Sequence, residues 1–161
     1  MGISPYLAAL REKVGTDLLL APSVAVLARD EDGRVLMVLN RETGLWQTIG
    51  GALEPDESPQ EAARREALEE AGVTVELLGI LAVTGGKAFR LTYPNGDQMA
   101  YVSTVFDAVV TAGEPRPDGD ETSAVEWFTL HELAALETDD FTRALLAQAI
   151  PPGGIEPPLR A

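Results

Sequence analysis

The chain has 161 residues, of which 26 are acidic and 12 are basic, so its formal net charge is −14 at pH 7. A chain of this length falls in the range of a single domain, about 100–200 residues, with a sizeable core. It contains no cysteine and one histidine, His131, to which we assign no role. Disulfides, thiolate metal sites and a thiol nucleophile are therefore excluded, and a bound metal would need oxygen ligands.

The distribution of charged and apolar residues also limits the partners. The arginines and lysines are few and scattered, so polynucleotide phosphates would repel this acidic chain. No apolar run approaches the roughly 18 residues of a membrane span, and the N-terminal sequence lacks the pattern of a signal peptide. We therefore expect a cytoplasmic protein that binds neither a polynucleotide nor a membrane.

The first elements are a helix and three strands. Ser4, followed by proline, predicts the start of a helix that ends near Val14. The runs 24–28 and 35–39 predict two strands, and the Asp-Glu-Asp-Gly sequence between them is typical of a hairpin turn. A short strand is predicted at Trp46–Ile49.

A second helix follows. Ser58 precedes a proline and lies three residues before Glu61, which is the pattern of a capping box. We expect this helix to run to Ala71 and to stop at Gly72.

The second half of the chain is predicted to contain four strands, one hairpin turn and one helix. The strands are 73–84, 88–93, 99–110 and 125–129, the turn is 94–97, and the helix is 140–149. Strands outnumber helices and one helix lies between two groups of strands, which predicts an α+β domain, a mixed sheet with flanking helices.

The domain organisation is simple. Residues 1–150 are expected to form a single domain, in which residues 1–20 are an N-terminal helical extension. Residues 151–161 are rich in proline and glycine, and we expect a flexible tail there. Two arrangements of the first helix are open: it packs on its own domain, or it exchanges with a second copy in a homodimer.

Three carboxylates are predicted to share one side of the second helix. At the helical rotation per residue, Glu66, Glu69 and Glu70 fall within an arc of about 100°. Like charges at this spacing repel each other, and Arg65 can compensate only one of them. A solvated acidic face is one reading. The other is a site for a hard divalent cation, since Mg²⁺ takes one or two carboxylates and shares phosphate oxygens of a substrate.

The spacing of this segment favours the second reading. After a glycine come five residues, a glutamate, seven residues, an Arg-Glu pair, and then a Glu-Glu pair and a second glycine. This pattern resembles the Nudix box, and all seven fixed positions match: Gly51, Glu57, Arg65, Glu66, Glu69, Glu70 and Gly72. Two positions depart from the usual pattern, because Ala67 is a small aliphatic residue and Ile49 replaces a proline that many members carry.

The resemblance implies an α/β/α sandwich and the hydrolysis of a nucleoside diphosphate linked to another group, X. It also implies that Mg²⁺ or Mn²⁺ binds to Glu66, Glu69, Glu70 and the carbonyl oxygen of Gly51. By the same similarity Arg65 would orient a glutamate, Glu57 would steady the start of the helix, and Gly72 would end it in a left-handed conformation.

The general base is one of two carboxylates. The candidates are Glu66 and Glu121, which precedes Trp127 by six residues, where relatives often carry a further metal-binding or basic glutamate. The expected catalytic groups are thus Arg65, Glu66, Glu69 and Glu121, and Glu121 is also an expected metal ligand. A solvated loop acid is the alternative reading of Glu121.

Substrate contacts are expected from cations and aromatic rings. Arg41, Lys87 and Arg90 are candidates to contact the distal phosphate or sugar, and Trp46 is a candidate to stack on a base. The competing readings are surface solubility for the cations and core packing for the tryptophan.

Three functions remain open, all with a small nucleotide as partner. The first is a metal-dependent hydrolase of ADP-ribose-like substrates, favoured by the long segment that holds the Tyr93 turn. The second is a pyrophosphatase that removes nucleoside triphosphates. The third is a non-catalytic nucleotide-binding module, which the intact carboxylates of the box disfavour.

Overall fold

One mixed sheet of seven strands organises the computed structural model, which describes residues 4–155. The strands are β1 (Leu19–Arg29), β2 (Val35–Asn40), β3 (Trp46–Ala52), β4 (Thr74–Thr84), β5 (Arg90–Thr92), β6 (Gln98–Ala112) and β7 (Thr122–Phe128). The helices are α1 (Pro5–Val14), α2 (Pro59–Ala71), α3 (Leu130–Leu133) and α4 (Asp140–Ala149), with a 3₁₀ turn η1 (Lys87–Phe89).

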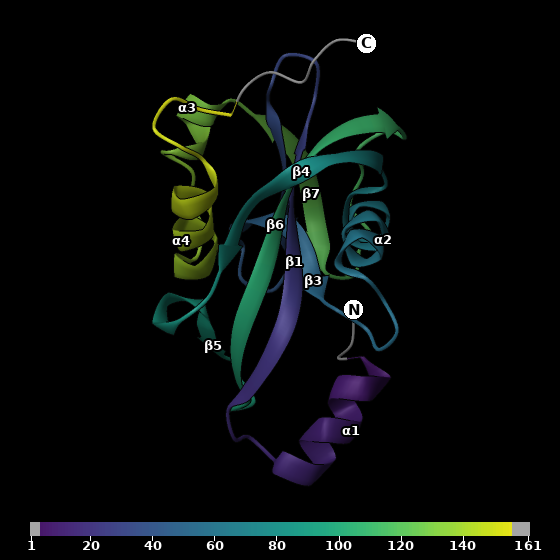
Figure 1. Ribbon diagram of the computed structural model, residues 1–161, viewed down its shortest axis with the longest axis vertical. Helices are drawn as coiled ribbons and strands as arrows, with labels where there is room; N and C mark the ends of the chain where they lie inside the picture. The colour runs from purple at the N-terminus through teal and green to yellow at the C-terminus, as the bar shows by residue number, and fades with distance from the viewer. Residues whose placement is uncertain (1–3, 156–161) are drawn as a thin grey trace.

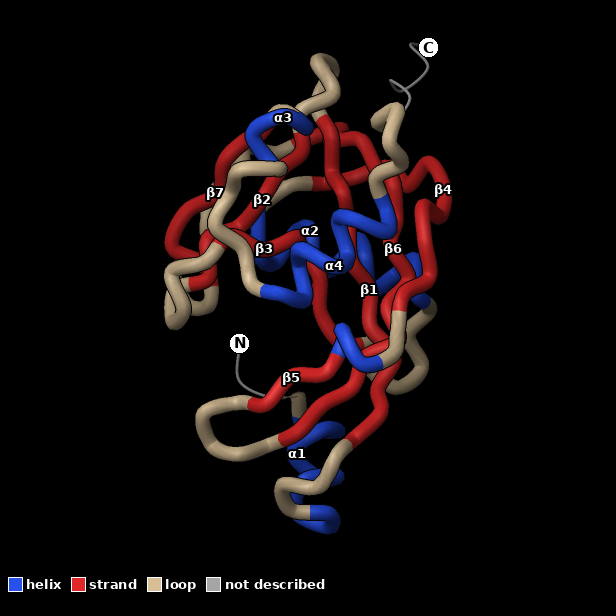
Figure 2. The backbone as a smooth tube through the Cα atoms, turned by 90° about the vertical axis from the view of Figure 1, so that its left-hand side faces the viewer, coloured by secondary structure: helices blue, strands red, loops and turns tan. Residues whose placement is uncertain are grey.

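The strand order is β4-β6-β1-β3-β2-β7, and β5 pairs with residues 98–100 at the start of β6. The long pair of β1 and β6 is parallel, and the other strand pairs are antiparallel. Helix α2 covers one face of the sheet and α4 covers the other (Figure 1). In Figure 2, α4 runs across the face that is turned to the viewer. The predicted mixed sheet with flanking helices is confirmed.

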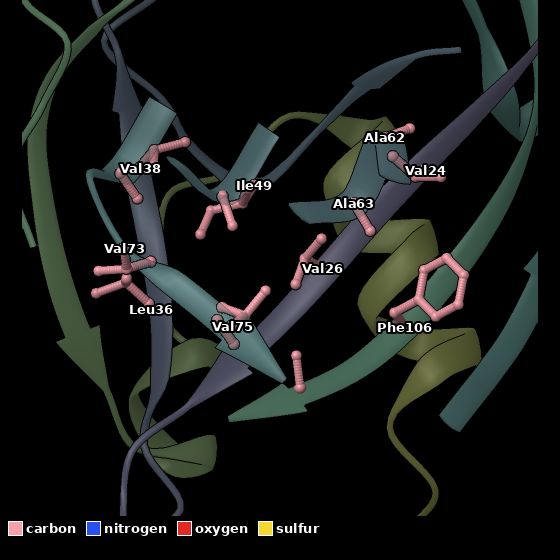
Figure 3. Close-up of a cluster of buried hydrophobic side chains, with 14 residues drawn as sticks. Val24, Val26, Leu36, Val38, Ile49, Ala62, Ala63, Val73, Val75 and Phe106 are labelled. Carbon is pink, nitrogen blue, oxygen red and sulfur yellow. The ribbon is translucent and has the colours of Figure 1, made fainter. Parts of the chain in front are cut away.

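Each face of the sheet carries its own hydrophobic cluster. On one face, alanines of α2 pack against valines of the sheet, and Figure 3 shows Ala62 and Ala63 next to Val24 and Val26. On the other face, leucines of α4 pack with residues of β1, β2 and η1, and Phe89 contacts Phe141 edge to face at 5.1 Å. The two clusters fix α2 and α4 on opposite faces of the sheet.

Helix α1 lies at the N-terminal end of β1, away from the sheet and from the two helices that cover it (Figure 1). Its predicted start is confirmed, because the Ser4 side chain accepts the N–H of Leu7 at 3.2 Å. It buries no residue. Its anchor is Arg11, whose guanidinium donates to the carbonyl oxygen of Gln98 at 2.7 Å and pairs with Asp97 at 3.5 Å.

Two local predictions need correction. Strand β1 begins at Leu19, five residues earlier than predicted, because its parallel pairing with β6 runs from Leu19 opposite Met99. The predicted strand 88–93 contains only three strand residues, because the Phe89 N–H donates to the Gly86 carbonyl and closes the turn η1. The helix start expected at His131 is confirmed by α3, where Thr129 and Glu132 form a capping box.

The described part of the chain ends at Ile155. Ile155 packs against the cluster under α4. Residues 156–161 of the expected tail lie outside the described residues. Within residues 4–155, no helix has the length and apolar character needed to cross a membrane.

Candidate active site

The loop between β3 and α2 brings the glycines of the box to the start of the helix. Ser58 and Glu61 form the predicted capping box, in which each side chain bonds the backbone N–H of the other residue. The helix ends at Gly72, whose φ of 69° lies in the left-handed region that glycine adopts without strain. Both predicted ends of α2 are therefore confirmed.

Small residues allow α2 to lie close to β3. The helix buries four alanines, which are Ala62, Ala63, Ala67 and Ala71. At Gly51, an added Cβ atom would lie only 2.2 Å from Oε1 of Glu66. The Glu66 carboxylate thus occupies the space that any side chain at position 51 would need, and it lies beside the backbone that is the expected source of a carbonyl ligand.

Arg65 connects the carboxylates of the box. Its Nε and Nη2 donate to the two carboxylate oxygens of Glu57 at 2.7 and 2.9 Å. Its Nη1 donates to Glu66 at 2.7 Å and to Glu69 at 3.1 Å. The bonds from Arg65 lower the pKa of Glu57, and those to Glu57, Glu66 and Glu69 raise the pKa of Arg65. This bidentate pair fixes the guanidinium.

Glu66 and Glu70 are buried carboxyl groups with raised pKa values. Burial is the main cause for both, and it outweighs the bonds from Arg65 to Glu66 and from the Gly50 N–H to Glu70. The Gly50 N–H donates to Oε2 of Glu70 at 3.0 Å. The charge of Glu121 raises both pKa values further.

The loop between β6 and β7 carries Glu121. Within it, Oδ1 of Asp118 accepts the backbone N–H groups of Asp120, Glu121 and Thr122 at 3.0, 3.1 and 2.9 Å. Burial raises the pKa of Asp118, but these bonds outweigh it and lower the pKa overall. The loop is thereby shaped around one carboxylate oxygen.

The donor set suits a hard divalent cation. It consists of carboxylate oxygens and a carbonyl, and the buried negative charges lack full compensation, since Arg65 is shared among three carboxylates. Among the described residues, no three acidic or histidine side chains already surround a common cation position. Arg65 holds Glu66 and Glu69, while the Gly50 N–H holds Glu70, so a cation would compete with these bonds.

The four expected substrate-binding residues fall in two segments: Arg41 and Trp46 belong to the hairpin of β2 and β3, and Lys87 and Arg90 lie at η1 and the start of β5. Arg41 donates through its guanidinium to the Gly119 carbonyl, and its N–H bonds the Glu121 carbonyl at 2.8 Å. Lys87 and Arg90 are exposed, next to Phe89, which packs on the α4 side of the sheet. Trp46 packs against Phe128 with ring centroids 4.8 Å apart. Of the four, only Arg41 contacts a loop that bears an expected ligand.

Sequence reasoning missed two features near the box. One is Thr122, which is 2% exposed and whose hydroxyl lies 3.1 Å from the Glu70 carbonyl oxygen. An aspartate four residues before a threonine is a local signal that could have indicated this loop. The other is a cleft of about 320 Å³ between α1 and the loop that enters α2, lined by Tyr6, Leu7, Ala21, Pro22, Ala52, Leu53, Glu54, Pro55 and Glu57.

Comparison with known proteins identifies the class to which this fold and site belong. The model of the NUDIX domain matches residues 19–149, so the chain belongs to the Nudix family. A MutT-like protein of Streptomyces ambofaciens is 32% identical over 124 residues, which are 77% of this chain and 73% of that protein. Nucleoside triphosphatase NudI of Enterobacter sp. is 30% identical over 108 residues, 65% of this chain and 76% of that protein.

A solved structure supports the same assignment. The crystal structure of the MutT NUDIX hydrolase from Burkholderia pseudomallei superposes with a TM-score of 0.67 at 28% identity, covering 81% of this chain and 98% of that one. The protein is accordingly a MutT-like Nudix pyrophosphohydrolase, an enzyme that hydrolyses phosphoanhydride bonds.

Proposed function

We propose that the protein hydrolyses the pyrophosphate bond of a small nucleotide with Mg²⁺ or Mn²⁺ bound at the box. The ligands in this proposal are the carboxylates of Glu66, Glu69, Glu70 and Glu121 and the carbonyl oxygen of Gly51. The observation that carries it is the buried pair Glu66 and Glu70. Burial raises the pKa of both carboxyl groups, and nearby carboxylates raise it further. A buried cluster of this kind calls for a cation.

A bound divalent cation would neutralise phosphate oxygens and lower the pKa of a bound water. The protein groups orient this chemistry. Arg65 fixes the carboxylates of Glu66 and Glu69 through its Nη1, while its other two nitrogens are held by Glu57. This arrangement leaves little freedom to the catalytic carboxylates, which is the condition for efficient positioning of a reacting water.

Two residues remain candidates for the general base. Burial raises the pKa of Glu66, so its carboxylate is a stronger acceptor of a proton from water. Glu121 lies in a half-buried position close enough to raise the pKa of Glu66. Replacing each by glutamine separates the two, when the pH dependence of kcat is compared with that of the wild type. Only the variant without the general base should lose the fall of kcat at low pH.

A nucleoside triphosphate is the first substrate to test. The Enterobacter relative bears the name of a nucleoside triphosphatase, and it is 30% identical over most of its length. The ADP-ribose preference stays a prediction that rests on the segment of Tyr93. That segment is fastened to the end of α1, since Asp97 pairs with Arg11 and the Gln98 N–H donates to the Thr16 carbonyl.

The test is a hydrolysis screen, read by chromatographic separation of the nucleotide products, over nucleoside triphosphates, their 8-oxo forms, ADP-ribose, nucleotide sugars and dinucleoside polyphosphates. Each is assayed with Mg²⁺, with Mn²⁺ and with EDTA. Hydrolysis that EDTA abolishes supports the proposal, and the best kcat/KM identifies the substrate class. Hydrolysis that is unaffected by EDTA would contradict the metal-dependent mechanism. Nucleotide binding without turnover would point to the non-catalytic module.

A further inference from the structure

Arg41 lies at the end of β2, against the loop that carries Glu121. A register shift between Leu39 and Asn40 brings Asn40 opposite Thr122 at the start of β7. The next residue, Arg41, therefore meets the loop twice: its N–H donates to the Glu121 carbonyl at 2.8 Å, and its guanidinium donates to the Gly119 carbonyl. Both backbone carbonyls next to Asp120 are thus bonded by one residue.

The same loop is fastened to α2 on its other side. The buried Thr122 hydroxyl lies 3.1 Å from the Glu70 carbonyl oxygen and 2.9 Å from Oδ1 of Asp118. The Arg116 N–H donates to the Ala71 carbonyl at 2.9 Å. The loop is therefore held between β2 and the last turn of α2, the turn that contains Glu70.

This fastening places an acidic loop next to buried acids. The carboxylates of Glu66 and Glu70 are buried on α2, and Glu121 directly precedes Thr122, whose hydroxyl bonds the Glu70 carbonyl. Since like charges repel, a loop held from both sides is needed to keep Glu121 next to the helix. Arg41 supplies the bonds to the loop on the β2 side.

We infer that Arg41 is a positioning residue, which holds the loop 118–122 against the last turn of α2 and so fixes the place of Glu121 next to that helix. The inference rests on the proposed function insofar as Glu121 serves the bound cation. It gives Arg41 a role different from the phosphate contact that the sequence suggested.

Two substitutions of Arg41 distinguish these roles. Arg41→Gln retains an N–H donor for the Gly119 carbonyl but has no charge, whereas Arg41→Met retains neither. Under positioning, Arg41→Met lowers kcat by about 10-fold with KM within about 2-fold of the wild type, as changes to residues that orient metal ligands do. Arg41→Gln keeps most of the activity. A phosphate contact predicts that both variants raise KM alike, and that result would overturn the inference.

Mn²⁺ binding, measured by electron paramagnetic resonance without nucleotide, gives a second readout. We expect Arg41→Met and Glu121→Gln each to weaken Mn²⁺ binding by about 10-fold, and the double variant to be no weaker than Glu121→Gln alone. Multiplied effects in the double variant, or unchanged Mn²⁺ affinity in Arg41→Met, would refute the positioning role. This measurement decides the question even if no nucleotide is hydrolysed and the proposed function fails.

Hydrogen exchange then locates the effect. The backbone amides of Asp120, Glu121 and Thr122, which bond Asp118 in the wild type, should exchange faster in Arg41→Met and not in Arg41→Gln. Arg143→Met is the matched control, because Arg143 is also exposed and donates to a backbone carbonyl, that of Thr138 at 2.9 Å. Equal changes in the control variant would show a general loss of charge and would overturn the inference.

Discussion

The two helices that cover the sheet are built on opposite plans. Helix α4 buries Leu145, Leu146, Ala149 and Thr142, so its inner side is mostly aliphatic. Helix α2 buries four alanines and two glutamates, Glu66 and Glu70. Helix α4 therefore contributes buried apolar area, whereas α2 has small apolar side chains, so that its charged groups can lie against the sheet.

This difference separates stability from chemistry within one domain. Burial of leucine side chains stabilises a fold by about 1.5–3 kcal/mol each, while a buried carboxylate costs free energy unless it is paired. We therefore expect changes in α4 to affect folding and changes in α2 to affect catalysis. Substitutions in the two helices, and at the glycine that α2 faces, test this division.

The largest effect is expected at Glu69. Glu69→Gln removes the charge of one expected ligand but preserves its shape, and we expect kcat to fall by about 1,000-fold, or about 4 kcal/mol, as for the loss of a group that stabilises a transition state. The thermal midpoint should change little because the side chain is 42% exposed. Steady-state kinetics measure the loss, with Glu76→Gln on β4 as a charge-matched control. Wild-type activity of Glu69→Gln would remove Glu69 from the site.

The next effect is on stability, in α4. Leu145 is fully buried, so Leu145→Ala should lower the free energy of unfolding by about 3 kcal/mol. Urea titration measures the loss. The fraction that remains folded should keep the wild-type kcat. A large fall in kcat at full occupancy of the folded state would break the division between the helices.

The third test is the contact between α2 and β3. In Gly51→Ala, the new Cβ would lie 2.2 Å from Oε1 of Glu66 and would displace that carboxylate. We expect kcat to fall by about 30-fold, or about 2 kcal/mol, together with weaker Mn²⁺ binding. Gly79→Ala on β4 is the control, since an added Cβ there meets no atom within 4 Å. Equal kinetics for the two variants would mean that Glu66 need not lie against position 51.

The smallest effect concerns the cost of burying Glu70. Burial raises the folded-state pKa of Glu70, so the wild type in EDTA loses stability as the pH rises through that pKa. Glu70→Gln does not titrate there, and its thermal midpoint should exceed that of the wild type by a few degrees at pH 8 and by less at pH 5.

Bound metal should reverse the order of the two thermal midpoints. Saturating Mg²⁺ should stabilise the wild type and leave Glu70→Gln nearly unchanged, because only a protein that binds a ligand gains stability from it. A lower midpoint for Glu70→Gln in EDTA at pH 8 would contradict the expected cost of the buried charge.

Local signals explain which parts of the fold were predictable. Both ends of α2 are specified by neighbours in the sequence, namely the Ser58 and Glu61 capping box and Gly72. The start of β1 depends on pairing with β6, about 80 residues further along the chain, so the strand extends beyond its apolar run. The same holds for residues 88–93, where the turn η1 shortens the strand.

The site was predictable to the extent that it is contained in one helix and its loop. The spacing of the box brought Glu57, Arg65, Glu66 and Glu69 together, and the bonds of Arg65 to the three glutamates follow that pattern. The position of Arg41 was not predictable, because it depends on a register shift between β2 and β7. A single-residue irregularity in a strand pair leaves no signal in hydrophobic periodicity.

The parallel pair of β1 and β6 has a consequence for the synthesis of the protein. All eleven residues of β1 pair with residues 99–109, so the central pair of the sheet cannot form until β6 has left the ribosome. Helix α2 packs on β1 and β3 and on Phe106 and Ala108 of β6, so its hydrophobic cluster is incomplete until then. Folding dominated by such distant contacts is slow. We expect the nascent chain to stay unfolded through α2 and β4 and to fold cooperatively once residue 112 is available.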